Sequence, residues 1–149
     1  MVSETYEIKN ETETALLAEK IASELTGREL IALDGDLGAG KTFFTGALCE
    51  AIGIKRKNVS SPTFVIMKKY DGRFSVFHWD FYRISSPEEL SVADFFEYLK
   101  EGNSITIIEW ASMFKECWED HLPRIEIKIE FGENEDERRI EIKRYSEKR

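Results

Sequence analysis

The sequence predicts an α/β fold: a single domain with a mixed central β-sheet flanked by helices. Short apolar segments of strand length are interspersed with segments whose apolar residues recur at helical spacing. Two pairs of strand segments are joined by polar turns, which predicts antiparallel hairpins in the same sheet. A chain of 149 residues is long enough for one domain with a proper core, so residues 1–149 are treated as one unit.

The first elements are a strand, a helix and a second strand. Thr5–Ile8 is a short strand segment, and Asn10 followed by Glu13 has the spacing of a helix-starting capping box. The helix is predicted to end near Gly27, and its apolar face comprises Leu17, Ala18, Ile21, Ala22 and Leu25. The apolar segment Leu30–Leu33 is the next strand and leads directly into the most informative part of the chain.

Residues 35–42 fit the phosphate-loop pattern Gly-x-x-x-x-Gly-Lys-[Ser/Thr], with the sequence Gly35-Asp36-Leu37-Gly38-Ala39-Gly40-Lys41-Thr42. Such a loop needs glycines because its backbone turns tightly and aims N–H groups at phosphate oxygens. Lys41 is expected to reach the β- and γ-phosphates, and the Thr42 hydroxyl to bind Mg²⁺. Apolar residues from Phe43 to Ile52 predict the helix that must follow, which ends at Gly53. The pattern therefore predicts a P-loop NTPase-like fold with a nucleotide site.

The middle of the chain predicts a hairpin and a helix. The segments Thr63–Tyr70 and Phe74–Trp79 flank Asp71-Gly72, a strong turn signal. Ser86-Pro87-x-Glu89 predicts a helix start with proline at the first helical position. This helix is apolar nearly all round as far as Leu99, so most of it is expected in the core, with one side open as an alternative interface.

The last third predicts a strand, a short helix and a final hairpin. Ser104–Glu109 is an apolar strand that ends in a carboxylate, and a short helix is expected over residues 113–118. From Ile125 to Phe131 apolar residues alternate with charged ones, and the polar loop Gly132–Glu137 separates this strand from a second one around residues 140–142.

Charge and composition narrow the function classes. The net charge of −8 disfavours a general nucleic-acid binder. Residues 41–83 nevertheless hold eight Lys and Arg against three acidic residues, a net charge of +5. Either this span surrounds its own triphosphate site, or it forms a basic face for an acidic partner or an RNA backbone. No apolar run is long enough for a membrane span, and two cysteines without metal-site spacing indicate free thiols in a reducing, cytoplasmic setting.

Two carboxylates are candidates for the metal and for hydrolysis. Glu109 ends one predicted strand and Asp80 ends another, and ligands of α/β sheets lie beyond the carboxyl ends of strands. An ordinary loop carboxylate is the alternative for either residue. His78 lies two residues before Asp80 and is interpreted as an orienting group, and Arg83 as a phosphate or carboxylate clamp.

Two further residues of this region are Thr63 and Tyr82. Thr63 follows a Ser-Pro turn, where it could sense the γ-phosphate or Mg²⁺, and the start of a surface strand is the alternative. Tyr82 is interpreted as a core residue.

Four motifs together resemble the TsaE family, formerly called YjeE. They are residues 35–48 with the phosphate loop, Ser61-Pro62-Thr63-Phe64, His78-x-Asp80-x-Tyr82-Arg83, and Ile107-Ile108-Glu109-Trp110. The resemblance runs from near residue 10 to the final hairpin. Phe43 departs from it, because the family often has a second threonine there, and residues 90–98 match only loosely.

The resemblance implies a small ATPase needed for the threonylcarbamoyladenosine modification of tRNA beside the anticodon. It implies ATP and Mg²⁺ as ligands and the TsaB–TsaD complex as the partner, with tRNA engaged only through that complex and no membrane. By the family pattern Lys41 and Thr42 hold phosphate and Mg²⁺, and Thr63 lies in a switch-like segment. Asp80 and Glu109 serve the metal and hydrolysis, and Trp110 lies close to the nucleotide; from the residues alone Trp110 would be assigned to the core.

Two other functions remain open from the sequence. A small-molecule kinase would need an arginine-rich lid over its acceptor, and no segment has clustered arginines. A nucleotide-gated binding module would share the phosphate loop but barely hydrolyse ATP. Slow intrinsic turnover is expected for the ATPase, since no arginine finger other than Arg83 is evident.

Overall fold

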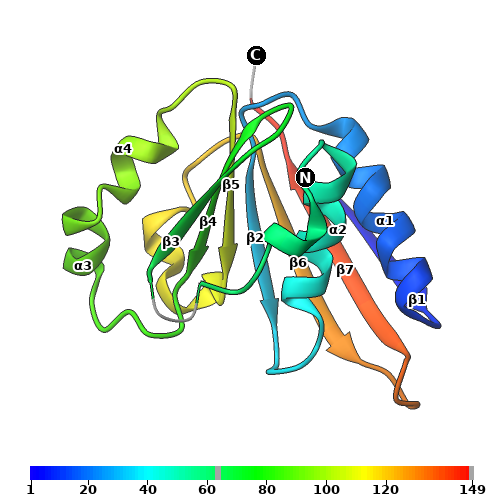
Figure 1. Ribbon diagram of the computed structural model, residues 1–149. Helices are drawn as coiled ribbons and strands as arrows, with labels where there is room; N and C mark the ends of the chain where they lie inside the picture. Colours follow the sequence, from blue (N-terminus) through cyan, green and yellow to red (C-terminus); the bar gives the residue numbers. More distant parts are fainter. Residues whose placement is uncertain (63–64, 148–149) are drawn as a thin grey trace.

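The computed structural model describes residues 1–62 and 65–147. Within them the strands form one seven-stranded sheet in the order β1-β7-β6-β2-β5-β4-β3 (Figure 1). The strands are β1 (Val2–Ile8), β2 (Leu30–Gly35), β3 (Met67–Asp71), β4 (Ser75–Asp80), β5 (Ser104–Glu109), β6 (Arg124–Phe131) and β7 (Arg138–Tyr145). The helices are α1 (Glu11–Glu24), α2 (Lys41–Ala51), α3 (Pro87–Val92) and α4 (Phe95–Leu99), with 3₁₀ segments η1 (Arg56–Asn58) and η2 (Ala111–Cys117).

The sheet is mixed, as predicted. Strand β2 pairs in parallel with β5 and β6, and β4 pairs in parallel with β5. The two predicted hairpins, β3–β4 and β6–β7, add the antiparallel pairs, and β1 joins the sheet antiparallel to β7. The carboxyl ends of β2, β5 and β4 therefore meet at one edge, which is the lower edge in Figure 1.

Helices cover both faces of the central strands (Figure 1). On one face, Ile31 and Leu33 of β2 pack with α1 and α2 in a largely aliphatic core. On the other, Leu30 and Ala32 belong to a more aromatic core beneath α3, α4 and η2. Parallel strands buried on both faces need apolar residues at every position, which explains the unbroken run Leu30–Leu33.

The outer hairpin has only one buried face. In β6, Ile127 and Ile129 are buried while Lys128 and Glu130 are exposed, so the predicted alternation is confirmed. Phe131 was expected to face inward, but 51% of its surface is exposed. It lies at the very end of the strand, where the Arg138 guanidinium packs over its ring at 4.8 Å.

The start of α1 confirms the predicted capping box in modified form. The side chain of Asn10 accepts a hydrogen bond from the N–H of Glu13 at 3.0 Å. The Glu13 carboxylate accepts from the N–H of Lys9, one residue before the cap, rather than from Asn10 itself. Both donors would otherwise lack a partner at the helix start, so the two bonds fix where α1 begins.

The single helix expected from Ser86 to Leu99 is wrong. Two short helices, α3 and α4, meet at Asp94, whose backbone is left-handed with φ of 62°. Asp tolerates this conformation better than most residues. The break lets Leu90 and Phe95 both reach the aromatic core, whereas one straight helix with apolar residues all round would turn half of them away. Even so, 85% of Val92 remains exposed.

The first strand of the middle hairpin is shorter than predicted. The expected strand began at Thr63, but β3 begins at Met67, and Thr63 and Phe64 lie outside the described residues. The carbonyl of Ile66 still accepts from the N–H of Asp80 at 3.1 Å, so pairing extends one bond beyond the strand.

Among residues 1–62 and 65–147, no helix is long and apolar enough to cross a membrane.

Candidate functional site

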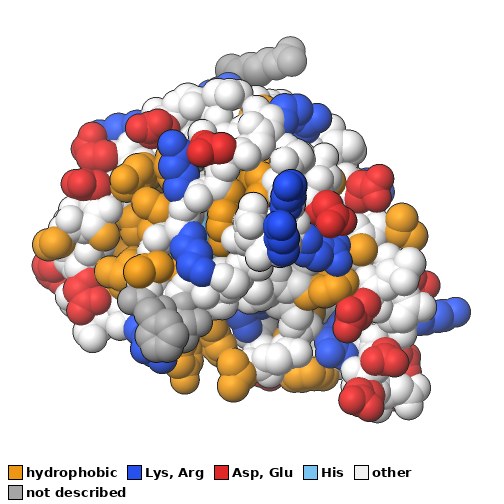
Figure 2. Space-filling model, viewed as in Figure 1, with side chains coloured by type: hydrophobic (Ala, Val, Ile, Leu, Met, Phe, Trp, Pro, Cys, Tyr) orange, Lys and Arg blue, Asp and Glu red, His pale blue; other side chains and the backbone are white. Residues whose placement is uncertain are grey.

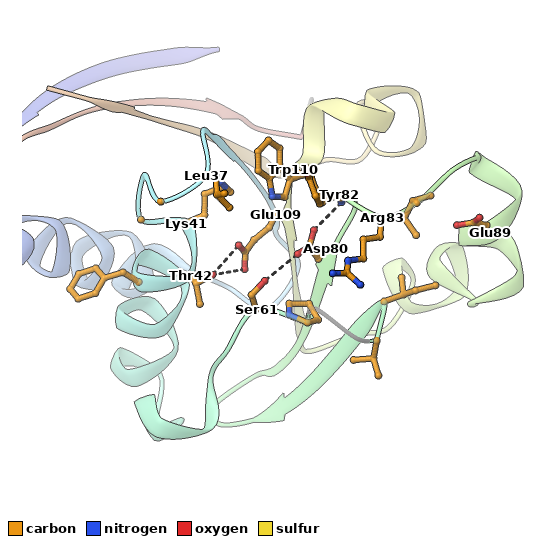
Figure 3. Close-up of a pocket in the computed structure, with 17 residues that line it drawn as sticks. Leu37, Lys41, Thr42, Ser61, Asp80, Tyr82, Arg83, Glu89, Glu109 and Trp110 are labelled. Carbon is orange, nitrogen blue, oxygen red and sulfur yellow. Dashed lines mark hydrogen bonds between the residues drawn. The ribbon is translucent and has the colours of Figure 1, made fainter.

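A pocket of about 600 Å³ opens at the carboxyl ends of β2, β5 and β4 (Figure 3). Its walls come from the phosphate-loop segment, from the segment before β3 and from the ends of β4 and β5. The lining residues include Leu37, Gly38, Gly40, Lys41, Thr42, Phe43, Ser61, Asp80, Tyr82, Arg83, Glu109 and Trp110.

The loop between β2 and α2 has the strand-before, helix-after context that its sequence pattern requires. Gly38 and Gly40 have φ of 81° and 111°, in the left-handed region where a Cβ is strained. At Gly35 a Cβ would lie 2.6 Å from the Ile129 carbonyl oxygen of β6. Because Gly40 is the N-cap of α2 and has no side chain, the first-turn N–H groups receive no capping bond from it.

Lys41 begins α2, and only 6% of its surface is exposed. Its Nζ donates to the carbonyl oxygens of Gly35 at 2.5 Å and Asp36 at 3.1 Å, so the ammonium lies inside the loop. Burial lowers the pKa of Lys41, and nearby carboxylates, with Glu109 foremost, act in the opposite direction. A partly desolvated cation held by two carbonyl oxygens is suited to exchange those partners for phosphate oxygens.

Thr42 and Glu109 come from elements far apart in the sequence and meet in the pocket (Figure 3). The Thr42 hydroxyl donates to the Glu109 carboxylate at 3.1 and 3.3 Å across 67 residues of chain. Glu109 is the last residue of β5 and only 2% exposed, and β5 is the direct neighbour of β2. Strand order therefore brings together two residues to which the sequence assigned the metal.

Asp80 lies beside Glu109, because the two residues are register partners in the parallel pair β4–β5. Its carboxylate accepts from the Ser61 hydroxyl at 3.1 Å and from the N–H of Tyr82 at 2.9 Å. Both predicted carboxylates thus end adjacent strands and line the same pocket. An ordinary loop location is excluded for Glu109, which is buried within the strand.

Trp110 closes one side of the pocket. Its ring lies 4.1 Å from Lys41 Nζ, within range of a cation–π contact, and 4.9 Å from the Tyr82 ring. Its backbone is left-handed, with φ of 59°, at the turn from β5 into η2. The core interpretation of Tyr82 is wrong: 57% of this residue is exposed, because the chain turns outward after β4 and places the ring at the pocket mouth.

The remaining candidates divide into two groups. Leu37, Phe43 and Arg83 line the pocket. Gly35, Asp36 and Ala39 do not line it: the first two give carbonyl oxygens to Lys41, and Ala39 is buried. Thr63 lies outside the described residues, so its expected role stays a prediction.

Sequence reasoning missed two residues that hold the site together. The sequence indicates Ser61 only as part of a motif, yet its hydroxyl donates to the Asp80 carboxylate. Arg138 on β7 donates from Nε to the carbonyl oxygen of Ala39 at 2.9 Å and so anchors the loop from the far hairpin. The Ser-Pro turn was a signal for the first. Nothing near Arg138 in the sequence points to the loop, since 99 residues separate the partners.

Known proteins resemble this chain over most of its length. A family model described as "Threonylcarbamoyl adenosine biosynthesis protein TsaE" matches residues 8–140. The chain belongs to the TsaE family. The proteins named tRNA threonylcarbamoyladenosine biosynthesis protein TsaE from Rickettsia felis and Bacillus subtilis are 39% and 38% identical to it. These matches cover 83% of this chain and 70% of the Rickettsia protein, and 88% and 79% for the Bacillus protein.

A solved structure extends the likeness to three dimensions. The crystal structure of YdiB from Bacillus subtilis superposes with a TM-score of 0.71 at 29% sequence identity, covering 95% of this chain and 84% of that one. The family resemblance drawn from four short motifs is therefore confirmed over most of the chain, and so is the P-loop NTPase-like fold.

Proposed function

We propose that this TsaE-family protein is a Mg²⁺-dependent ATPase that serves the threonylcarbamoyladenosine modification of tRNA. The observation that carries the proposal is the meeting of Lys41 and Thr42, at the start of α2, with Glu109 at the end of the adjacent parallel strand. A phosphate loop facing a strand-terminal carboxylate is the arrangement that phosphate-transferring P-loop proteins share. The modification itself is named in the family description and in the relatives' names.

The residues present suit a magnesium nucleotide. Thr42, Asp80 and Glu109 offer the oxygen ligands that Mg²⁺ prefers. Within the described residues no group of three or more His, Cys, Asp or Glu side chains forms a self-sufficient metal site. This fits an ion that takes its other ligands from phosphate and water. When bound, Mg²⁺ would offset the negative charge on the phosphate oxygens.

Each residue has a distinct proposed role. Lys41 and the first-turn N–H groups of α2 bind the β- and γ-phosphates. The Thr42 hydroxyl and the two carboxylates, Asp80 and Glu109, hold the metal and orient an attacking water, and a carboxylate can accept that water's proton. Trp110 covers Lys41 and keeps bulk water from its ammonium.

The proposed partner is the TsaB–TsaD complex, with tRNA reached only through it. Figure 2 shows Lys and Arg side chains across the middle of one face, with acidic side chains at its left edge and at the tip of the β6–β7 hairpin. The basic span 41–83 contains Lys41 and Thr42 of the phosphate loop and also Asp80, so nucleotide binding and partner docking would share a face. The net charge of −8 disfavours free tRNA as a ligand. Free cysteines at positions 49 and 117 support a cytoplasmic location.

Phosphate release and partner binding test the proposal together. ATP turnover should be slow alone and should rise when TsaB–TsaD is added. Affinity for that complex should differ between an ATP analogue, ADP and no nucleotide, and linkage requires the partner to tighten the preferred nucleotide by the same factor. Equal partner affinity in all three states, with unchanged hydrolysis, contradicts the proposal. Transfer of phosphate to a small acceptor would indicate a kinase, and nucleotide-dependent docking without hydrolysis a binding module.

A further inference from the structure

A chain of buried polar side chains leads away from the pocket behind Glu109. The Glu109 carboxylate lies 2.5 Å from Nε2 of His78, and Nδ1 of His78 lies 3.1 Å from the Tyr70 hydroxyl. That hydroxyl lies 3.1 Å from the carbonyl oxygen of Ser60 and 3.4 Å from its N–H. His78 is 0% exposed, Glu109 2% and Tyr70 7%, so water does not separate these groups.

Sheet register explains how the three side chains meet. His78 on β4 is the register partner of Lys68 on β3 and of Ile107 on β5. Tyr70 and Glu109 each lie two residues further along their strands, on the same face of the sheet as His78. Such diagonal neighbours are too far apart for short side chains but within reach of an aromatic ring. The His78 imidazole, on the middle strand β4, therefore contacts Tyr70 on β3 and Glu109 on β5.

The number of protons on each side chain decides which atom donates and which accepts in these hydrogen bonds. Glu109 also accepts from the Thr42 hydroxyl, and an ionised carboxylate only accepts, so we assign the proton of the His78–Glu109 contact to Nε2. The Tyr70 hydroxyl has one proton, which it gives either to His78 Nδ1 or to the Ser60 carbonyl. Only when the proton goes to Nδ1 can a neutral imidazole with its own proton on Nε2 bond both Tyr70 and Glu109, so this arrangement gives the continuous chain.

We propose that His78 and Tyr70 are positioning residues that hold the Glu109 carboxylate in its working orientation and connect it to the loop at Ser60. The inference rests on the proposed ATPase function and deepens it. A glutamate at the bottom of a pocket can rotate about its side-chain torsions, and an Nε2–H bond to one oxygen leaves the other free for Thr42, metal or water. The short, buried contact with His78 supplies this constraint.

The same loop also contacts the second carboxylate. Ser60 binds the Tyr70 hydroxyl, and the next residue, Ser61, donates its own hydroxyl to Asp80 at 3.1 Å. Two consecutive residues thus reach both carboxylates of the pocket, one directly and one through Tyr70 and His78. A shift of this loop would change the hydrogen bonds of Asp80 and Glu109 at once. The position of residues 60 and 61 therefore affects the orientation of both carboxylates.

NMR of the histidine ring nitrogens tests these buried hydrogen bonds in the absence of nucleotide. The sequence contains two histidines, His78 and His121, so protein labelled with ¹⁵N-histidine gives two imidazoles, and a His121→Gln variant assigns them. His78 should be protonated at Nε2 with a strongly hydrogen-bonded proton, and Tyr70→Phe should shift its Nδ1 signal while leaving His121 unchanged. A His78 ring without a proton on Nε2 overturns the inference.

Kinetics then test positioning against a merely structural role. His78→Leu keeps the apolar bulk and should lower kcat by about tenfold or more, with the Mg²⁺ requirement for binding an ATP analogue raised by a similar factor. KM for ATP should change less than about twofold, because Lys41 and the loop are untouched. His78→Gln places an amide N–H near the position of Nε2 and should recover part of the loss. Tyr70→Phe should cost about threefold, since it removes only the outer contact.

His121→Gln is the matched control, because this ring bonds the carbonyl oxygen of Arg28 outside the pocket, and it should behave as wild type. A folded His78→Leu variant with wild-type kcat and Mg²⁺ dependence overturns the inference while leaving the ATPase proposal standing. Equal losses in His78→Gln and His78→Leu also overturn it, since the donor to Glu109 would then be irrelevant. A wild-type protein that neither binds nor hydrolyses ATP overturns the proposed function, and the inference with it.

Discussion

The two ends of the central strands each contain one buried glutamate, but the two are held in different ways. Glu29, at the amino end just before β2, is 7% exposed and accepts mainly from backbone: the N–H groups of Thr26, Gly27 and Arg28 donate at 3.0 to 3.1 Å, and the Thr26 hydroxyl adds one bond at 2.9 Å. Glu109, at the carboxyl end of β5, accepts from the side chains of Thr42 and His78.

The difference indicates which glutamate is structural and which is functional. Backbone donors of one tight turn cannot leave Glu29 without undoing the turn, so this carboxylate stabilises the chain entry into β2. The Thr42 hydroxyl can rotate, so Glu109 can exchange this partner for metal or water while His78 and the strands stay in place. Helix α2 spans both ends, with Lys41 at the pocket and Cys49 in the aliphatic core near its other end.

The largest effect is expected at the pocket end. Lys41→Ala should weaken ATP binding at least about 100-fold, since one buried cation supplies the charge at the β- and γ-phosphates. Titration calorimetry measures the affinity, and circular dichroism should show an intact fold. Lys100→Ala, on an exposed lysine after α4, is the matched control and should bind normally. Unchanged ATP affinity in folded Lys41→Ala protein contradicts the assignment of the loop.

At the amino end, Glu29→Ala should lower the free energy of unfolding by about 2 kcal/mol, because it leaves three N–H groups of the turn without their acceptor. Urea denaturation measures this loss, and Glu29→Gln, which retains an acceptor oxygen, should lose less. Hydrolysis per folded molecule should match wild type. A stable Glu29→Ala protein with impaired hydrolysis would erase the distinction between the two ends.

Replacing either pocket carboxylate should show the opposite pattern. Glu109→Gln and Asp80→Asn keep the size of the side chain but remove its charge, so hydrolysis should fall at least about tenfold, roughly 1.4 kcal/mol of barrier. Nucleotide binding should fall less, and stability should change less than in Glu29→Ala. Phosphate-release assays at saturating ATP decide the matter, and wild-type turnover in either variant removes that residue from the proposed mechanism.

The smallest effect concerns pH and Cys49. Burial raises the pKa of this thiol to about 12 from an ordinary value of 9.0. Between these values the folded state keeps the proton that the unfolded chain releases, so stability is full below pH 9 and is lost as pH rises toward 12. Between pH 8.5 and 10, wild type should lose about 1 kcal/mol more stability than Cys49→Ala. Parallel pH profiles for the two proteins would show that Cys49 ionises freely in the folded state.

The parts of the site predicted from sequence are those formed by neighbouring residues. The phosphate loop, the strand before it and the helix after it lie within about twenty residues, and glycine positions and apolar spacing suffice to specify them. The hairpin turn at Asp71-Gly72 and the cap at Asn10 were also predictable, because each depends on a few side chains and the backbone beside them.

Contacts between distant elements were decided only by the tertiary structure. The sequence put a carboxylate at the end of two strands, but strand order and register brought Glu109 to Thr42 and set His78 between Glu109 and Tyr70. The break at Asp94 likewise arose because two apolar segments had to reach one core. Local spacing determines which elements form and which face is apolar. Which faces meet depends on the packing of the whole sheet, and no short stretch of sequence records that packing.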